Sequence, residues 1–208
     1  MAGIPGGKTL AVIVAAVVLT IYGWLNSERE TQVTQPASMG VTSSPIPEFT
    51  YTNQEGKRFG SEELRGSVWV ANVIYTRCPT IASPMTANMA RLQEKLRKAH
   101  LDAELVSFSA DPLFDRPHVL KTFADRLRVE FSNWNFLTHN DEPELHRFLK
   151  TAFTAPVERQ TSPADDGPPQ IRHSSRFYLV GKDGRVMGAY NGLSPNYDQL
   201  LQDIRSLE

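Results

Sequence analysis

The sequence predicts an α/β fold, with a central mixed sheet, flanking helices and an N-terminal hairpin, preceded by one transmembrane helix. Strand-like runs alternate with amphipathic helical segments, and the last two strand-like runs flank a Gly-Lys-Asp-Gly turn at residues 181–184. Such alternation is typical of a sheet that contains parallel strands and is covered by helices on both faces. An uncharged run near the N-terminus predicts the membrane helix.

The uncharged run covers residues 9–25 and would form a helix of about 26 Å, close to the lower limit for crossing a bilayer. We therefore expect residues 1–25 to be a membrane anchor. A cleaved signal peptide is the alternative, but no small-residue cleavage site follows the run. Lys8 precedes it and Glu28 follows it, so the positive-inside rule places the C-terminal domain on the extracytoplasmic (periplasmic) side of a cytoplasmic or inner membrane.

The composition of the chain limits its domain organisation, its partners and its redox chemistry. Residues 26–46 are rich in Ser, Thr, Gln and Pro and are expected to be a flexible linker, which leaves residues 47–208 for one domain. The hydrophobic content of 40% predicts a packed core. With 22 Lys and Arg against 23 Asp and Glu there is no basic excess, so nucleic acid is not an expected partner. The single cysteine, Cys78, excludes an internal disulfide or a two-cysteine redox centre.

The first half of the domain contains a predicted hairpin around Glu55 and Gly56 and a buried strand within residues 67–76. Apolar residues then recur at helical spacing up to about His100, which predicts an amphipathic helix with Met85 and Met89 facing the core.

The second half continues the alternation. The expected elements are a strand within residues 103–110, a helix from Pro117, a strand at 133–138, a helix capped by Asp141, a polar loop at 154–170, a hairpin around 181–184 and a final helix at 195–207. A cysteine between the first buried strand and its helix, followed later by an antiparallel hairpin, is a thioredoxin-like arrangement.

Cys78 is a candidate for chemistry because of its place in this order. It follows the carboxyl end of a predicted strand, where open α/β sheets bind their ligands, and it precedes a helix N-terminus, which stabilises a thiolate. The alternative is an inert, buried cysteine that acts as a small hydrophobic residue.

Four stretches resemble the SCO/SenC family, thioredoxin-like copper-handling proteins of the respiratory chain. They are residues 75–96 (YTRCPTIASPMTANMARLQEKL), 109–115 (SADPLFD), 131–139 (FSNWNFLTH) and 173–192 (HSSRFYLVGKDGRVMGAYNG). They occur in the family's order, and the resemblance covers about residues 46–207.

The resemblance implies a copper site made of two cysteines separated by three residues and a distant histidine. By position, the first cysteine is Cys78 and the histidine is His173, while Ala82 stands at the second cysteine; with a one-residue insertion Ser83 would stand there instead. Neither alignment restores a thiol, so this chain looks like a divergent member with a weak or incomplete copper site. A thioether from Met85 or Met89 could add a soft ligand, although their spacing favours a place in the core.

Two acidic residues, Asp111 and Asp115, follow the next predicted strand and are expected either to cap the loop or to influence the site. The other four histidines are expected to be solvated: His100, His118, His139 and His146.

The resemblance implies a membrane-anchored accessory protein for maturation of the copper centre of cytochrome c oxidase. Its expected partners are the copper-bearing oxidase subunit or another copper chaperone, and copper chaperoning or assembly is expected rather than enzymatic turnover. Two alternatives stay open. Cys78 could serve a one-cysteine thiol oxidoreductase or peroxidase, or the chain could be a degenerate paralogue that binds a partner without metal.

Overall fold

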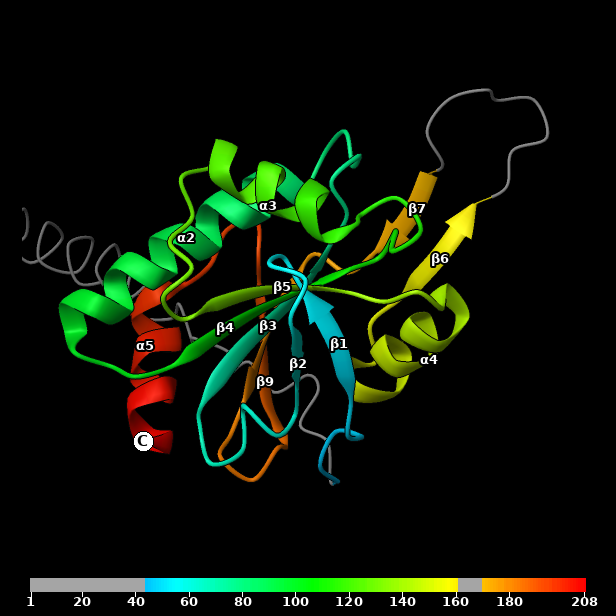
Figure 1. Ribbon diagram of the computed structural model, residues 1–208. Coiled ribbons are helices and arrows are strands. Elements are labelled where there is room, and N and C mark those ends of the chain that lie inside the picture. Colours follow the sequence, from blue (N-terminus) through cyan, green and yellow to red (C-terminus); the bar gives the residue numbers. More distant parts are fainter. Residues whose placement is uncertain (1–43, 161–169) are drawn as a thin grey trace, which may run out of the picture. The chain divides into compact units, whose positions relative to one another are not determined.

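The structure is a computed structural model that describes residues 44–160 and 170–208 (Figure 1). Its elements, in chain order, are β1 (Thr50–Asn53), β2 (Arg58–Gly60), β3 (Trp69–Ile74), α2 (Ala82–Ala99), β4 (Glu104–Ser109), α3 (Pro117–Arg126), β5 (Trp134–Thr138), α4 (Glu142–Phe153), β6 (Val157–Gln160), β7 (Gln170–His173), β8 (Arg176–Val180), β9 (Val186–Asn191) and α5 (Tyr197–Leu207).

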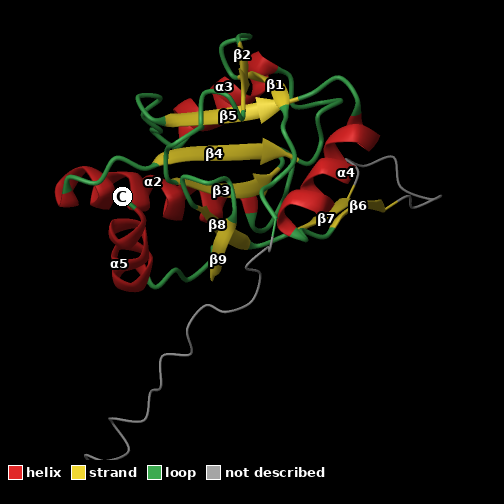
Figure 2. Cartoon of the chain, turned by 90° about the horizontal axis from the view of Figure 1, so that it is seen from below, coloured by secondary structure: helices red, strands yellow, loops and turns green. Residues whose placement is uncertain are grey.

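Seven of the strands form one mixed sheet in the order β2-β1-β5-β4-β3-β8-β9. Strands β3, β4 and β5 are parallel, whereas β8 runs antiparallel to β3 and is followed by β9 (Figure 2). The carboxyl ends of β3, β4 and β5 therefore lie at the same edge as the beginning of β8. That edge carries the loops that follow β3 and β4 and the residues that enter β8.

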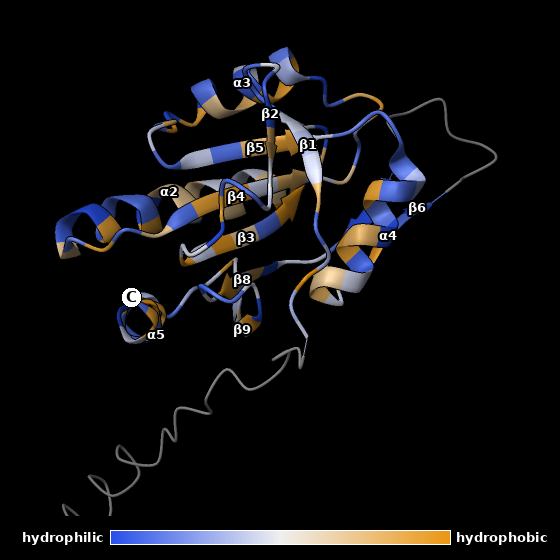
Figure 3. Cartoon of the chain, turned by 60° about the horizontal axis from the view of Figure 1, so that its bottom comes forward, coloured by the Kyte–Doolittle hydropathy of each residue, from blue (hydrophilic) through white to orange (hydrophobic). Residues whose placement is uncertain are grey.

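Each face of the sheet buries its own hydrophobic cluster. On one face α2, α3 and α5 pack through residues such as Met89, Leu120 and Ile204. On the other face α4 packs against the sheet through residues such as Phe148. Figure 3 shows the matching pattern, with hydrophobic residues along β3 and β4 and a mixture of hydrophilic and hydrophobic residues on α2. Removing this apolar surface from water is the main stabilising contribution to the fold.

Apart from β6 and β7, the predicted order of elements is confirmed, including the N-terminal hairpin and the late β8–β9 hairpin. One expectation was wrong: the polar segment at 154–170 is not simply a loop. Within it, β6 pairs antiparallel with β7 to form a separate two-stranded sheet. Only Val157 of β6 is buried, so the strand has almost no hydrophobic alternation that could have identified it.

The two methionines of α2 behave as the helical spacing predicts. Met85 and Met89 are both fully buried in the cluster beneath α2. Their thioethers pack in the core, so the alternative of a soft third ligand from either side chain is not supported.

No helix within residues 44–160 and 170–208 is long and apolar enough to cross a membrane. The expected anchor at residues 1–25, and the linker up to residue 43, lie outside the described residues. Near the start of the described residues, the N–H of Ile46 donates to the carbonyl oxygen of Gly184 at 2.9 Å.

Candidate metal centre

Cys78 lies in a tight turn between the end of β3 and the start of α2. Its backbone N–H donates to the carbonyl oxygen of Tyr75 at 3.1 Å, and its Sγ accepts from the N–H of Ile81 at 3.5 Å. Ile81 is the N-cap residue of α2. The sulfur therefore lies beside the unpaired N–H groups of a helix N-terminus, as the sequence predicted, and its residue is partly exposed.

His173 is the last residue of β7, and the fold brings it to Cys78 across 95 positions of sequence. Its Nε2 lies 3.5 Å from the Cys78 Sγ, and its Nδ1 lies 2.9 Å from the carbonyl oxygen of Val73. A carbonyl can only accept a hydrogen bond, so Nδ1 carries the proton in this contact. Nε2 is therefore the ring nitrogen that faces the sulfur, and it is the nitrogen that would bind a metal.

The surroundings make Cys78 an acidic thiol. Burial is the largest single influence and by itself would raise the pKa of this thiol. The hydrogen bond with His173 and those from the backbone N–H groups of Thr80, Ile81 and Ala82 together outweigh it and lower the pKa to about 5. Cys78 is therefore a thiolate at neutral pH, which is the form that binds metals and acts as a nucleophile.

Tyr75 forms one wall of the site. Its ring meets the His173 ring edge to face, with centroids 5.3 Å apart, and its hydroxyl oxygen accepts from the N–H of Ile171 at 3.4 Å. Burial raises the pKa of this phenol, which therefore stays protonated at neutral pH. Sequence reasoning did not select Tyr75, and its place immediately after the buried strand was the only signal available.

Asp115 anchors the loop that precedes Cys78. The N–H of Thr76 donates to Oδ2 at 3.1 Å, its hydroxyl donates to Oδ1 at 2.5 Å, and the Ser109 hydroxyl donates to Oδ2 at 2.7 Å. Asp115 is fully buried, and this burial raises its pKa even though all three bonds oppose the shift. The contact with Thr76 means that Asp115 does more than cap its own loop.

Asp111 is also fully buried, and it accepts from two arginines. Its Oδ2 lies 2.6 Å from Nη2 of Arg77, the residue before Cys78, and its Oδ1 lies 2.7 Å from Nη2 of Arg159. Arg159 belongs to β6 and also pairs with Glu142. Sequence reasoning missed Arg77 and Arg159, because neither arginine has a local pattern that distinguishes it from a surface residue.

The remaining histidines are not at this site, and two of them differ from the expectation. His139 lies 3.0 Å from Glu144, and His146 lies 2.7 Å from the carbonyl oxygen of Ala110; both are partly buried. These two were therefore wrongly expected to be solvated, because each side chain has a partner that only the folded chain provides. His100 and His118 are exposed, as expected.

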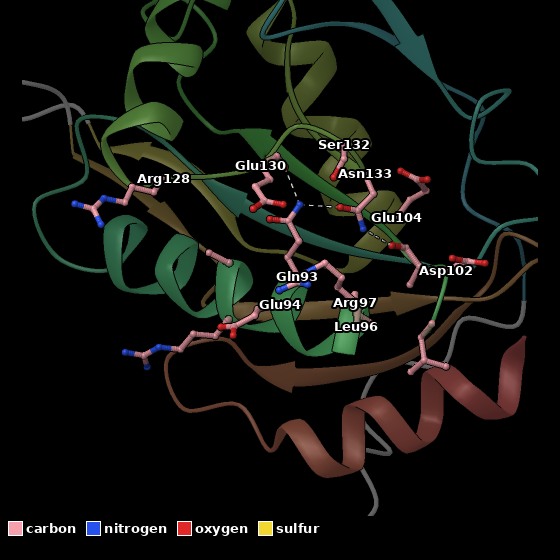
Figure 4. Close-up of a pocket in the computed structure, with 14 residues that line it drawn as sticks. Gln93, Glu94, Leu96, Arg97, Asp102, Glu104, Arg128, Glu130, Ser132 and Asn133 are labelled. Carbon is pink, nitrogen blue, oxygen red and sulfur yellow. Dashed lines mark hydrogen bonds between the residues drawn. The ribbon is translucent and has the colours of Figure 1, made fainter. Parts of the chain in front are cut away.

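A separate pocket of about 690 Å³ lies at the opposite edge of the sheet, where β4 and β5 begin (Figure 4). Gln93 of α2 donates from Nε2 to the carbonyl oxygen of Glu130 and to Oδ1 of Asn133, both at 2.7 Å. These polar groups already satisfy one another and tie loops to α2. The pocket contains neither cysteine nor histidine, so it is not the predicted site.

Within the described ranges, no group of three or more His, Cys, Asp or Glu side chains could hold a metal ion. The site thus offers two ligands of the predicted kind, Cys78 and His173. Ala82 is the fully buried first residue of α2 and belongs to a hydrophobic cluster that Cys78 also contacts. A thiolate and an imidazole form a donor set suited to copper, zinc or iron, and the soft thiolate favours copper(I) among them.

This sheet, with a reactive thiolate between the first parallel strand and its helix, defines a thioredoxin-like protein whose cysteine is paired with a histidine. The chain belongs to the SCO1/SenC family: the model of that family matches residues 39–207. It is 42% identical over 162 residues to the SCO1 protein homolog of Bacillus subtilis, covering 77% of this chain and 81% of the relative.

Solved structures agree with this assignment. A SCO1/SenC family lipoprotein from Bacillus anthracis superposes with a TM-score of 0.75 at 38% identity, covering 80% of this chain and 96% of that one. BsSco, described as a member of the Sco family of cytochrome c oxidase assembly proteins, superposes with a TM-score of 0.69 at 39% identity, covering 81% and 94%. Copper-bound ScoI from Bradyrhizobium japonicum shares the fold, with a TM-score of 0.63 at 19% identity, covering 79% and 100%.

Proposed function

We propose that this protein is an SCO-type accessory protein that handles copper during maturation of the copper centre of cytochrome c oxidase. In this proposal residues 1–25 anchor it in the membrane, and the domain acts on the extracytoplasmic side. Copper is the cargo, and the chain's own ligands for it are Cys78 and His173. The proposed partner is the copper-bearing oxidase subunit or another copper chaperone.

The observation that carries the proposal is the contact between Cys78 and His173. A sulfur 3.5 Å from an imidazole nitrogen, with the other ring nitrogen held by a backbone carbonyl, is a ligand pair whose geometry suits a metal. Family membership supports copper as that metal, since relatives with this fold include a copper-bound protein.

Two protein ligands would leave the copper partly open. Soft thiolates hold copper(I) well, so one thiolate in place of two gives a weaker site from which a partner can take the ion more easily. The chain has no second thiol at Ala82, and it therefore has no resolving thiol of its own for thiol–disulfide exchange. We infer that delivery or holding of copper, and not two-cysteine redox chemistry, is the work of this site.

A one-cysteine thiol enzyme is the second candidate, and the acidity of Cys78 favours it. A partly exposed thiolate at a helix N-terminus is a competent nucleophile toward a peroxide. Added peroxide should then convert Cys78 to a sulfenic acid much faster than it oxidises free cysteine. A rate no faster than that of free cysteine would remove this candidate.

Copper(I) titration of the purified protein under reducing conditions tests the copper proposal. We expect one copper(I) per chain, with binding lost in Cys78→Ala and strongly weakened in His173→Ala. His118→Ala is the matched control, because that histidine is exposed and contacts neither ligand. Unchanged copper stoichiometry and affinity in both site variants would contradict the proposal.

A partner-binding protein without chemistry would behave differently in cells. Cys78→Ala would then support cytochrome c oxidase assembly as well as the original sequence in a strain that lacks this protein. The copper proposal requires that this variant fail.

A further inference from the structure

We propose that Asp111 is a positioning residue that keeps Cys78 and His173 within hydrogen-bonding distance. It does so by joining the loop that carries Cys78 to the β6–β7 pair of strands that carries His173. This inference rests on the proposed function, since it concerns the same pair of ligands. It assigns a role to a buried carboxylate that would not itself contact the metal.

The first connection runs from Asp111 to the cysteine loop. Arg77 donates from Nε at 3.1 Å and from Nη2 at 2.6 Å, and both bonds end on the same carboxylate oxygen, Oδ2. Arg77 immediately precedes Cys78. Its guanidinium also lies 4.0 Å from the centre of the Phe114 ring, so the side chain is held on two sides. The backbone that leads into Cys78 is thereby fixed to the end of β4.

The second connection runs from Asp111 to the histidine hairpin. Arg159 donates to the other oxygen, Oδ1, at 2.7 Å. Arg159 lies in β6 opposite Ile171 of β7, and two positions along the same ladder Val157 lies opposite His173. Because β6 is paired with β7, holding β6 in place also holds the strand that ends in His173.

The two arginines around Asp111 explain why a carboxylate is needed at position 111. Asp111 has a side-chain exposure of 1%, and each of its oxygens serves a different guanidinium. Arg159 is shared with Glu142, so two acids and two bases form a neutral network. An amide can accept on only one atom and would direct an NH₂ group at the second arginine. The side chain in Asp111→Asn has the same shape as the original, but it can keep the hydrogen bond from only one of the two arginines, Arg77 or Arg159.

The single cysteine permits a direct test without metal, since alkylation reports on Cys78 alone. The full chain is alkylated with iodoacetamide over a range of pH, and the midpoint of the rate profile is compared in Asp111→Asn, His173→Asn and the double variant. We expect each single variant to raise the midpoint by about 1 pH unit or more, because the thiolate loses its contact with the imidazole. We expect the double variant to match His173→Asn, because both changes break the same contact.

Arg159→Gln provides a second route, because it removes the hairpin connection and leaves the buried carboxylate paired with Arg77. Arg159→Gln should raise the midpoint of the alkylation profile as Asp111→Asn does. It tests the positioning role of Asp111 even if the Asp111→Asn protein does not fold. Asp183→Asn is the control: it removes an exposed Asp–Arg pair at the β8–β9 turn, at the other edge of the sheet, and should leave the midpoint unchanged.

Two outcomes would overturn the inference. One is an unchanged midpoint in a folded Asp111→Asn or Arg159→Gln protein. The other is a midpoint in the double variant that rises by the sum of the two single shifts, which would show that Asp111 acts independently of the Cys78–His173 contact. Copper(I) titration of the same proteins tests the proposed function separately, so a chain that binds no copper could still show the coupling.

Discussion

The Nε2 atom of His173 lies 3.5 Å from the Sγ atom of Cys78, although the two residues come from different sheets. Cys78 follows β3 of the seven-stranded sheet, whereas His173 ends β7 of the two-stranded sheet. The hydrogen bond from Nδ1 of His173 to the carbonyl oxygen of Val73 joins the two sheets at this point. The proposed copper site therefore depends on how the small hairpin is placed against the end of β3.

The acidity of Cys78 gives the first prediction. Its alkylation rate should rise with pH to a midpoint near 5, well below the ordinary cysteine value of roughly 8.5. Above that midpoint the rate should be flat, because the thiol is already a thiolate. Replacing His173 with Asn removes a hydrogen bond that lowers the pKa and should move the midpoint upward. A profile that rises only above pH 8 in the unchanged protein would contradict this account.

Restoring a thiol at position 82 gives the second prediction. Ala82 and Cys78 contact the same hydrophobic cluster, and a Cys at 82 would add a second soft ligand. We expect Ala82→Cys to raise copper(I) affinity at least about tenfold, as measured by competition with a chelator under reducing conditions. Ala90→Cys is the control, because Ala90 lines the pocket at the opposite edge of the sheet and its thiol should not contribute. Equal affinity in the two variants would mean that position 82 does not face the site.

Two phenylalanines that differ in burial give the third prediction. Phe108 is fully buried and its ring lies 5.4 Å from Phe49 and 5.5 Å from Phe148, centre to centre. Phe108→Ala should lower the free energy of unfolding by about 3–5 kcal/mol. Phe114→Ala should cost about 1 kcal/mol or less, because Phe114 is 42% exposed and loses mainly its contact with Arg77. Urea denaturation followed by tryptophan fluorescence measures both, and similar losses would contradict the assigned core.

The buried carboxyl of Asp115 gives the fourth prediction, on stability against pH. Its pKa is raised in the folded protein, so the folded state binds its proton more tightly than the unfolded state does. The stabilisation from that proton is fully present below the unfolded pKa of 3.8 and is lost as pH rises through the folded pKa. Asp115→Asn carries no such proton. Its stability relative to the unchanged protein should therefore improve as pH rises from 4 to 7.

Chemical denaturation at several pH values checks this fourth prediction. Asp125→Asn is the control, since it makes the same substitution at an exposed carboxyl instead of a buried one. A difference between the Asp115→Asn and unchanged proteins that stays constant across this pH range would show that burial does not raise the pKa.

The order of elements could be predicted from the sequence because each buried strand and each amphipathic helix carries its own periodic signal. Strand β3 is buried at all six positions, and α2 repeats its apolar residues along one face. Strand β6 has one buried residue in four and carried no such signal. Elements with weak local patterns are defined by the partner they pair with, and β7 supplies that partner.

The candidate site was predictable only in part, for the same reason. Cys78 was found from its place between a strand and a helix, and His173 from its match to the family pattern. The residues that hold them were not: Arg159 meets Asp111 from 48 positions away, and the bond to Val73 comes from a backbone carbonyl that any residue possesses. Long-range contacts of these kinds leave no trace in local spacing.

The bond between His173 and Val73 attaches one ligand of the site to the interior of the sheet. Val73 lies at the centre of the sheet and is fully buried, so its backbone should open only when the whole domain unfolds. Cys78 lies in the turn that follows this strand, β3, and is partly exposed, so its sulfur is the ligand nearer to solvent. The imidazole is therefore the buried ligand of the pair and the sulfur the more accessible one. In the proposed function, a partner that takes the copper ion would therefore reach it from the side of the cysteine.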